Sequence, residues 1–151
     1  MTERDQAERG QAEGDQAGRR TYEQRTGDVV VRVEPDFLSE QSSPQDDRFI
    51  WAYHVEIENH SGEDMQVMER FWTIADSRGQ VQEVRGVGVV GETPVVRSGE
   101  TFRYSSGAPL TAPSAMMLGT YRMETPDGES HEIHIPTFTL ESPYQGVTSW
   151  N

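Results

Sequence analysis

The chain has 151 residues, enough for one folded domain with a substantial core. Its 13 basic residues are all arginine, and 26 acidic residues give it a net charge of −13. Because such a surface repels phosphate backbones and anionic lipid, we expect no nucleic acid and no membrane as partner. The absence of cysteine excludes disulfides and thiolate metal sites. With no apolar leader and no bilayer-spanning run, the expected location is cytoplasmic.

Residues 1–27 form a polar, repetitive segment. Three five-residue units centred on Gln-Ala stand at 4–8, 9–13 and 14–18. A period of five matches neither a helix nor a strand, and Tyr22 is the only large apolar side chain after Met1. We therefore predict a disordered N-terminal tail over residues 1–27.

The segment from residue 28 to residue 142 reads as a series of short strands. Residues 29–33 are β-branched, and Pro35 is expected to bend or interrupt that strand. Residues 49–58 show the clearest period-two pattern in the chain, which predicts a half-buried antiparallel strand. The inward set is Phe49, Trp51, Tyr53, Val55 and Ile57, and the outward set is His54, Glu56 and Glu58. Further strands are expected at 65–75, 81–85, 95–96, 101–104, 116–125, 129–135 and 138–140.

Turn residues separate these strands, and no apolar stripe has helical spacing. Asp76 and Gly79 stand at the ends of a predicted reverse turn, and a loop is expected around Gly107 and Pro109. The pattern predicts an all-β antiparallel sandwich over residues 28–142, followed by a C-terminal tail over 143–151.

Residues 86–91 have the spacing G-x-G-x-x-G, which in dinucleotide-binding folds cradles a pyrophosphate. That chemistry needs a helix directly after the glycines, but Pro94 and β-branched residues follow instead. A P-loop is excluded because the chain has no lysine. We interpret Gly86, Gly88 and Gly91 as backbone positions that need positive φ or close approach. A backbone nest for an anion, helped by Arg85 and Arg97, is the functional alternative.

Two other groups of side chains are weaker candidates. His54, Glu56 and Glu58 share the outward face of one predicted strand and could hold a divalent cation weakly, but such a group is more often simply the solvated face of an amphipathic strand. Ser105 and Ser106 offer hydroxyl groups, but no histidine base is expected near them.

Several blocks resemble the bacterial ApaG family. They are QSSPQDDRF at 41–49, RFWTI at 70–74, VRGVGVVGE at 84–92, YSSG at 104–107, GTYRM at 119–123 and IPTF at 135–138. The resemblance runs over residues 29–141 and implies a fibronectin type III-like β-sandwich. It invites a functional role for Gly86, Gly88, Gly91, Ser106 and Gly107. The sequence departs from the family at Val87, where relatives often have an acid, and at 112–115.

The ApaG resemblance implies a link to cobalt and magnesium tolerance and to dinucleoside polyphosphate breakdown, without a settled activity. Related domains in larger eukaryotic proteins suggest a protein-interaction module. We therefore expect a non-enzymatic module, with no resident cofactor, that binds an unidentified protein; a homodimer is left open. The alternatives are a binder of pyrophosphate-containing nucleotides at residues 86–91 and a weak divalent-cation binder.

Overall fold

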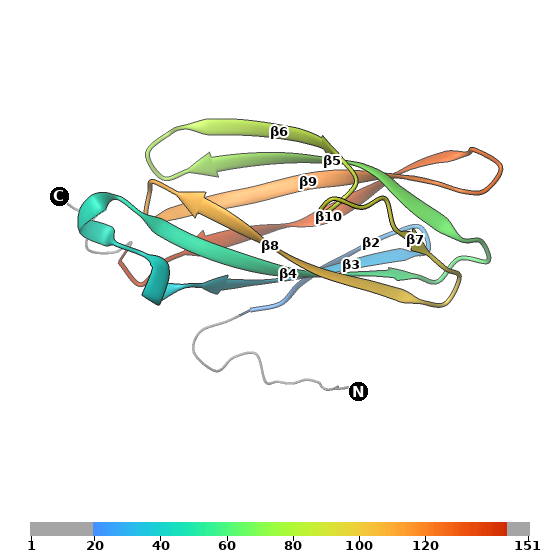
Figure 1. The fold of residues 1–151 in the computed structure, drawn as a ribbon, viewed down its shortest axis with the longest axis horizontal. Helices are drawn as coiled ribbons and strands as arrows, with labels where there is room; N and C mark the ends of the chain where they lie inside the picture. Colours follow the sequence, from blue (N-terminus) through green and yellow to red (C-terminus); the bar gives the residue numbers. More distant parts are fainter. Residues whose placement is uncertain (1–19, 145–151) are drawn as a thin grey trace.

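The computed structural model describes residues 20–144, which form two antiparallel sheets packed face to face (Figure 1). One sheet has the strand order β10-β9-β5-β6, with β7 also paired to β5, and the other has the order β2-β3-β4-β8. The strands are β2 (Tyr22–Thr26), β3 (Val29–Phe37), β4 (Phe49–Asn59), β5 (Met65–Asp76), β6 (Val81–Val87), β7 (Val95–Val96), β8 (Thr101–Leu110), β9 (Ser114–Glu124) and β10 (Ser130–Glu141). Two 3-10 turns, η2 (Ser39–Gln41) and η3 (Pro44–Asp46), connect β3 to β4.

This architecture confirms the predicted fibronectin type III-like sandwich. Residues 20–144 contain no α-helix, and hence none that could cross a bilayer. The predicted tails lie largely outside the described residues, which exclude 1–19 and 145–151.

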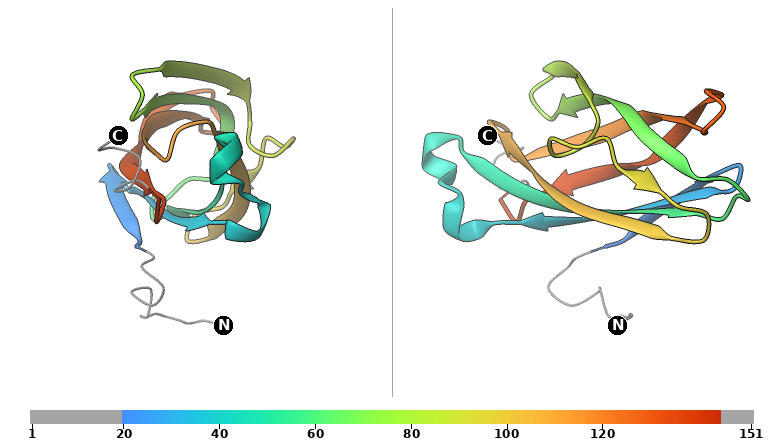
Figure 2. Two further views of the ribbon diagram at one scale, coloured as in Figure 1. Left: turned by 90° about the vertical axis from the view of Figure 1, so that its left-hand side faces the viewer. Right: turned by 45° about the vertical axis from the view of Figure 1, so that its right-hand side comes forward.

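The core lies between the two sheets, which enclose it in the end-on view of Figure 2. Strand β4 alternates as predicted, with every second side chain from Phe49 to Asn59 buried. From the opposite sheet, Trp72 and Phe138 meet edge to face, with ring centroids 5.9 Å apart. The apolar face of each strand therefore determines which side of its sheet packs against the core.

The predicted N-terminal boundary at residue 28 was wrong, because the sandwich begins at β2. Tyr22 to Thr26 pair with Val33 to Val29 on β3. The segment lacks apolar alternation since its contribution is mainly backbone pairing, with only Tyr22 and Thr26 at the half-buried ends. Tyr22 also donates or accepts a 2.9 Å hydrogen bond with Thr139 Oγ1, which ties β2 to β10.

Two predicted interruptions are also absent. Pro35 lies within β3, paired with Tyr53 of β4. It is tolerated because β2 begins at Tyr22, opposite Val33, so that β3 has only one neighbouring strand at Pro35. Gly107 and Pro109 lie within β8, not in a loop, because β8 is an edge strand that pairs with β4 alone.

Candidate functional site

The glycine stretch begins inside strand β6. Gly86 is the register partner of Arg70 on β5. The Arg70 guanidinium lies over Gly86, and its Nη1 donates hydrogen bonds to the carbonyl oxygens of Val87 (3.1 Å) and Gly88 (2.9 Å). A Cβ on Gly86 would stand only 2.7 Å from this guanidinium. The first glycine therefore makes room for an arginine of the same domain.

The loop after β6 is a tight turn held by its own backbone. Gly88 (φ 61°) and Gly91 (φ 80°) are in the left-handed region, and Val90 joins them at φ 42°. A Cβ on Gly88 would stand 1.8 Å from the carbonyl oxygen of Glu92, a distance no side chain could occupy. The interpretation that these glycines serve the backbone is thus confirmed at Gly88 and Gly91, where φ is positive.

Most N–H groups of this loop are bonded within the chain. Gly88 N–H donates to the carbonyl of Met68 (2.8 Å), while Val89 and Glu92 donate to each other's carbonyls (2.8 and 2.9 Å). Of the N–H groups in residues 88–92, only those of Val90 and Gly91 are left for a ligand. An anion nest needs successive N–H groups that converge on one point, so this loop offers little of one.

Arg85 and Arg97 do not lie together beside the loop. Arg85 is on the outer face of the five-stranded sheet, with its Cζ 4.6 Å from the ring centroid of Phe71. Arg97 follows β7, whose Val96 pairs with Met65. Six positions of β5 separate Met65 from Phe71, which is about 20 Å of extended strand. The two arginines therefore cannot clamp one small anion.

Ser106 and Gly107 lie in the other sheet, on β8. Ser106 faces inward opposite Tyr53, and Gly107 is opposite Ala52. Burial raises the pKa of Tyr53, while a hydrogen bond with Ser106 and the charge of Arg70 oppose that rise. Ser106 thus takes part in the interior packing of the sandwich rather than in a ligand loop.

A buried polar cluster joins the two sheets near these residues. The hydroxyls of Tyr104 and Tyr121 are hydrogen-bonded to each other across the core. Burial raises the pKa of both hydroxyls, and the charge of Arg70 opposes the rise. One sequence signal could have indicated this cluster, because Arg70 stands two residues before Trp72 and so points to the same inward side of β5.

His54 and Ser105 are brought together on the outer face of the four-stranded sheet, contrary to the expectation that no histidine lies near the Ser105 hydroxyl. They are register partners, and His54 Nδ1 is 2.6 Å from Ser105 Oγ. His54 Nε2 is 3.6 Å from Asp36 Oδ2. These three groups have the residue types of a catalytic triad, but they lie on an exposed sheet face and the carboxylate is beyond hydrogen-bonding distance.

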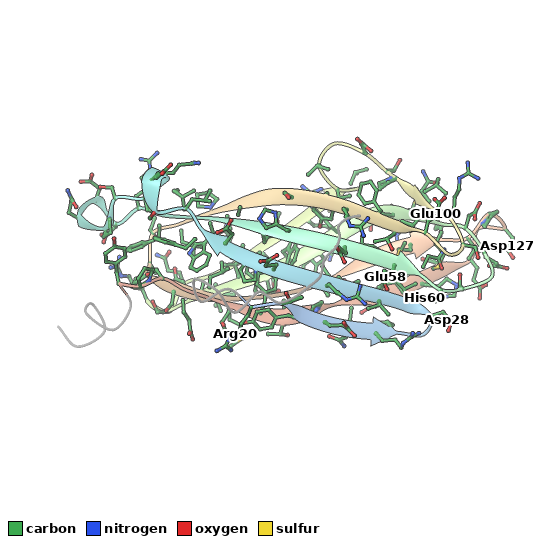
Figure 3. The ribbon with its side chains drawn as sticks, turned by 90° about the horizontal axis from the view of Figure 1, so that it is seen from below. Arg20, Asp28, Glu58, His60, Glu100 and Asp127 are labelled. Carbon is green, nitrogen blue, oxygen red and sulfur yellow. The ribbon has the colours of Figure 1, made fainter. Side chains whose placement is uncertain are left out.

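The other outward carboxylates of β4 are held in ion pairs. Arg32 bonds Glu58 and Glu23, and lies 3.5 Å from Glu56, which also accepts a 3.0 Å bond from Arg103. Figure 3 labels Glu58 and its neighbour His60, whose Nε2 is 3.0 Å from Glu58 Oε1. Within residues 20–144, no group of three or more His, Asp or Glu side chains is arranged to hold a metal ion.

Exposed apolar side chains gather on one side of the molecule. Within residues 20–144, seven large hydrophobic residues are exposed, and all except Tyr144 belong to the five-stranded sheet or to the loop after β6. They are Val81, Val87, Val90, Val95, Met116 and Leu118. Both outer faces carry ion pairs, since Arg122 of β9 bonds Glu69 and Glu124 on the five-stranded sheet. The exposed large apolar side chains, in contrast, lie on the five-stranded sheet and the loop after β6.

Both the sequence and the fold of this chain are similar to those of known proteins. A family model described as the ApaG domain matches residues 39–125. Protein ApaG of Rhodospirillum centenum is 51% identical over 123 residues, covering 82% of this chain and 95% of the relative. Protein ApaG of Parvibaculum lavamentivorans is 50% identical with the same coverage.

Solved structures agree with the sequence matches. The crystal structure of a Bordetella pertussis protein described as ApaA superimposes with a TM-score of 0.74 at 43% identity, covering 77% of this chain and 94% of that one. A family model over more than half of the chain and relatives of about 50% identity lead to one conclusion. The chain belongs to the ApaG family.

Proposed function

We propose that this chain is a non-enzymatic binding module that recognises another protein through the outer face of its five-stranded sheet. The observation that carries the proposal is the patch of exposed apolar side chains on β6 and β9. Met116, Ala75 and Val81 lie side by side across β9, β5 and β6, and Leu118 follows on the same face. Contiguous apolar surface of this kind marks interaction sites on soluble domains.

The negative charge of the chain favours a partner protein with a basic surface. The chain has 26 acidic residues against 13 arginines. Glu83 lies beside the apolar patch, across Thr73 of β5 from Leu118. A partner that covers Met116 and Leu118 with apolar side chains and surrounds them with Lys or Arg would meet complementary charge. A protein surface supplies both features, whereas a pyrophosphate-containing nucleotide supplies negative charge.

The alternatives have less support from the geometry. A nucleotide phosphate would find the N–H groups of Gly88, Val89 and Glu92 already bonded. A divalent cation at His54, Glu56 and Glu58 would have to displace Arg32 and Arg103 from the carboxylates. Cobalt or magnesium tolerance, if this chain contributes to it, would on this proposal act through the partner protein.

The test is photo-crosslinking in cells from a benzophenone side chain placed at Leu118. The matched control places the same group at Gln24, an exposed position on β2 of the other sheet. We expect a protein partner linked from Leu118 and not from Gln24, and weaker capture when Met116→Glu is added. Equal linkage from both positions, or no protein linked at Leu118, would contradict the proposal.

A separate experiment tests the proposal that the chain is not an enzyme. A fluorophosphonate probe labels serine hydroxyls that a histidine base has activated. We expect no labelling of Ser105, because His54 and Asp36 lie on an open sheet face. Labelling that is lost in Ser105→Ala and in His54→Gln would overturn this part and make the chain a hydrolase.

A further inference from the structure

Strand β6 has an open edge whose hydrogen-bonding groups can be assigned. At one end of the β5–β6 hairpin, Asp76 N–H donates to Gln80 C=O (2.9 Å), and at the other Gly88 N–H donates to Met68 C=O (2.8 Å). The register between these two bonds has no shift. Antiparallel pairing alternates with period two, so the even-numbered residues of β6 bond to β5. The peptide groups of Val81, Glu83, Arg85 and Val87 therefore point to the open edge, which is visible in Figure 1.

The same four residues place their side chains on the outer face. Val81 and Val87 are 65% and 72% exposed, the highest values among the exposed large hydrophobic residues of the described part. Glu83 and Arg85 form no ion pair with any residue in 20–144. Proteins usually blunt such an edge with proline, lysine or a bulge, and β6 has none of these.

We propose that two copies of this chain pair through β6, antiparallel, about a twofold axis that passes beside Val84. In this register Glu83 lies opposite Arg85 of the partner subunit, and Arg85 lies opposite Glu83 of the partner subunit. Val81 and Val87 likewise face each other at both ends. Every outward-facing position of the strand is thereby matched by opposite charge or by apolar contact, in the isologous manner of a twofold dimer.

Hydrogen bonding selects the same register. The residues brought opposite each other, Glu83 with Arg85 and Val81 with Val87, all belong to the set whose peptide groups point to the open edge. A slip of one residue would place these groups opposite ones already bonded to β5. The Val87 carbonyl, which accepts from Arg70, retains a second lone pair for the partner strand.

The neighbouring registers are unfavourable because they place like charges opposite each other. Centring the twofold axis on Glu83 places two carboxylates opposite each other, and centring it on Arg85 places two guanidinium groups opposite each other. Of the registers in which the open-edge groups meet, the one centred on Val84 alone pairs both charges with their opposites. The result joins the two five-stranded sheets into one continuous sheet.

A charge exchange tests this pairing with purified full-length chain. Sedimentation velocity should show concentration-dependent dimers of the native protein that weaken with added salt. Glu83→Arg and Arg85→Glu should each weaken dimerisation at least tenfold, because each creates like-charge pairs. An equimolar mixture of the two variants should form heterodimers, since both cross-strand pairs then have opposite charge. A native chain that stays monomeric near 1 mM, or a mixture that stays monomeric, would overturn the proposal.

A cysteine scan tests the register itself, because the chain has no cysteine of its own. Val84→Cys puts the two thiols opposite each other at a non-hydrogen-bonded pair, where Cα atoms are about 4.5 Å apart and a disulfide fits. Val81→Cys is the matched control, since it is more exposed but faces Val87 of the partner subunit. We expect the first to form covalent dimers faster; equal rates would exclude this register. Thermal melting of each variant checks that the fold is kept.

This inference does not depend on the proposed function. Dimerisation is measured on the purified chain alone, whereas partner recognition is measured by crosslinking at Leu118 on β9. Either experiment can fail while the other succeeds.

Discussion

The Arg70 guanidinium occupies the space that a side chain on Gly86 would need, with its Cζ 2.7 Å from the position of a Cβ there. From that place it donates to the carbonyls of Val87 and Gly88 and so fastens the start of the glycine loop. Gly86 and Arg70 come from adjacent strands, and each is needed for the position of the other. The spacing that imitates a phosphate-binding fingerprint thus has a local steric cause.

The three glycines should respond differently to alanine. Gly88→Ala is expected to cost about 3 kcal/mol or more, because its Cβ would overlap the Glu92 carbonyl. Gly91→Ala meets no atom within 4 Å and should cost about 1 kcal/mol through its φ of 80° alone. Urea unfolding measures both values. Equal costs would show that the turn does not have the geometry described.

The stability cost of Gly86→Ala should lie between the costs of Gly88→Ala and Gly91→Ala. The neighbouring group is the end of a flexible arginine side chain, which can move away at the expense of its two hydrogen bonds. We expect a loss of roughly 1–3 kcal/mol. Arg70→Met is the companion variant, and adding Gly86→Ala to it should cost much less than in the native chain. Additive costs would contradict the steric coupling of the two positions.

The sequence predicted the parts of the fold that depend on local pattern. Alternation in β4 was clear because one face is buried along its whole length. Strand β2 was missed because its side chains are mostly polar and its pairing depends on β3. Arg70 over Gly86 and His54 beside Ser105 depend on register between strands distant in sequence, which no local pattern reveals.

The Tyr104–Tyr121 pair should show the cost of an unpaired buried hydroxyl. Tyr104→Phe leaves the Tyr121 hydroxyl fully buried without its partner, and we expect a loss of about 1–3 kcal/mol in unfolding free energy. Replacing both tyrosines with phenylalanine should recover part of that loss. Urea unfolding of the single and double variants tests this. A double variant less stable than the sum of the singles would contradict it.

The same pair predicts sensitivity to high pH. Burial raises the pKa of Tyr104 and Tyr121 above the ordinary tyrosine value of about 10. A raised folded-state pKa contributes stability that is complete below pH 10 and is lost as the pH rises beyond it. We expect alkaline unfolding above about pH 10, with these phenols ionising only as the domain unfolds. Absorbance at the phenolate band measures the ionisation, and the double phenylalanine variant should unfold at higher pH.

The Arg32–Glu58 pair should contribute to acid sensitivity. Burial favours a raised pKa for Glu58, but hydrogen bonds from Arg32 and His60 outweigh it and lower the pKa. A lowered folded-state pKa stabilises the fold above the ordinary glutamate value, and this contribution is lost as the pH falls through the folded value. Glu58→Gln should therefore cost about 1 kcal/mol near pH 7 and less below pH 4.

The control for that titration is Glu100→Gln, whose carboxylate lies on the exposed turn before β8 and forms no ion pair within residues 20–144. Its unfolding free energy should follow that of the native chain from pH 7 to pH 4. If Glu58→Gln has the same pH profile as this control, the ion pair does not stabilise the domain.

Tyr22 should show that β2 belongs to the folded domain. Its ring centroid is 6.0 Å from that of Phe138, and its hydroxyl bonds Thr139, so it links the four-stranded sheet to the edge of the other. Tyr22→Ala removes both contacts and should cost about 2 kcal/mol, while Tyr22→Phe removes only the hydrogen bond and should cost about 1 kcal/mol. Gln24→Ala on the exposed part of β2 should change stability by less than about 0.5 kcal/mol. If Tyr22→Ala is as mild as Gln24→Ala, the sandwich is stable without β2 and its boundary lies at residue 28 after all.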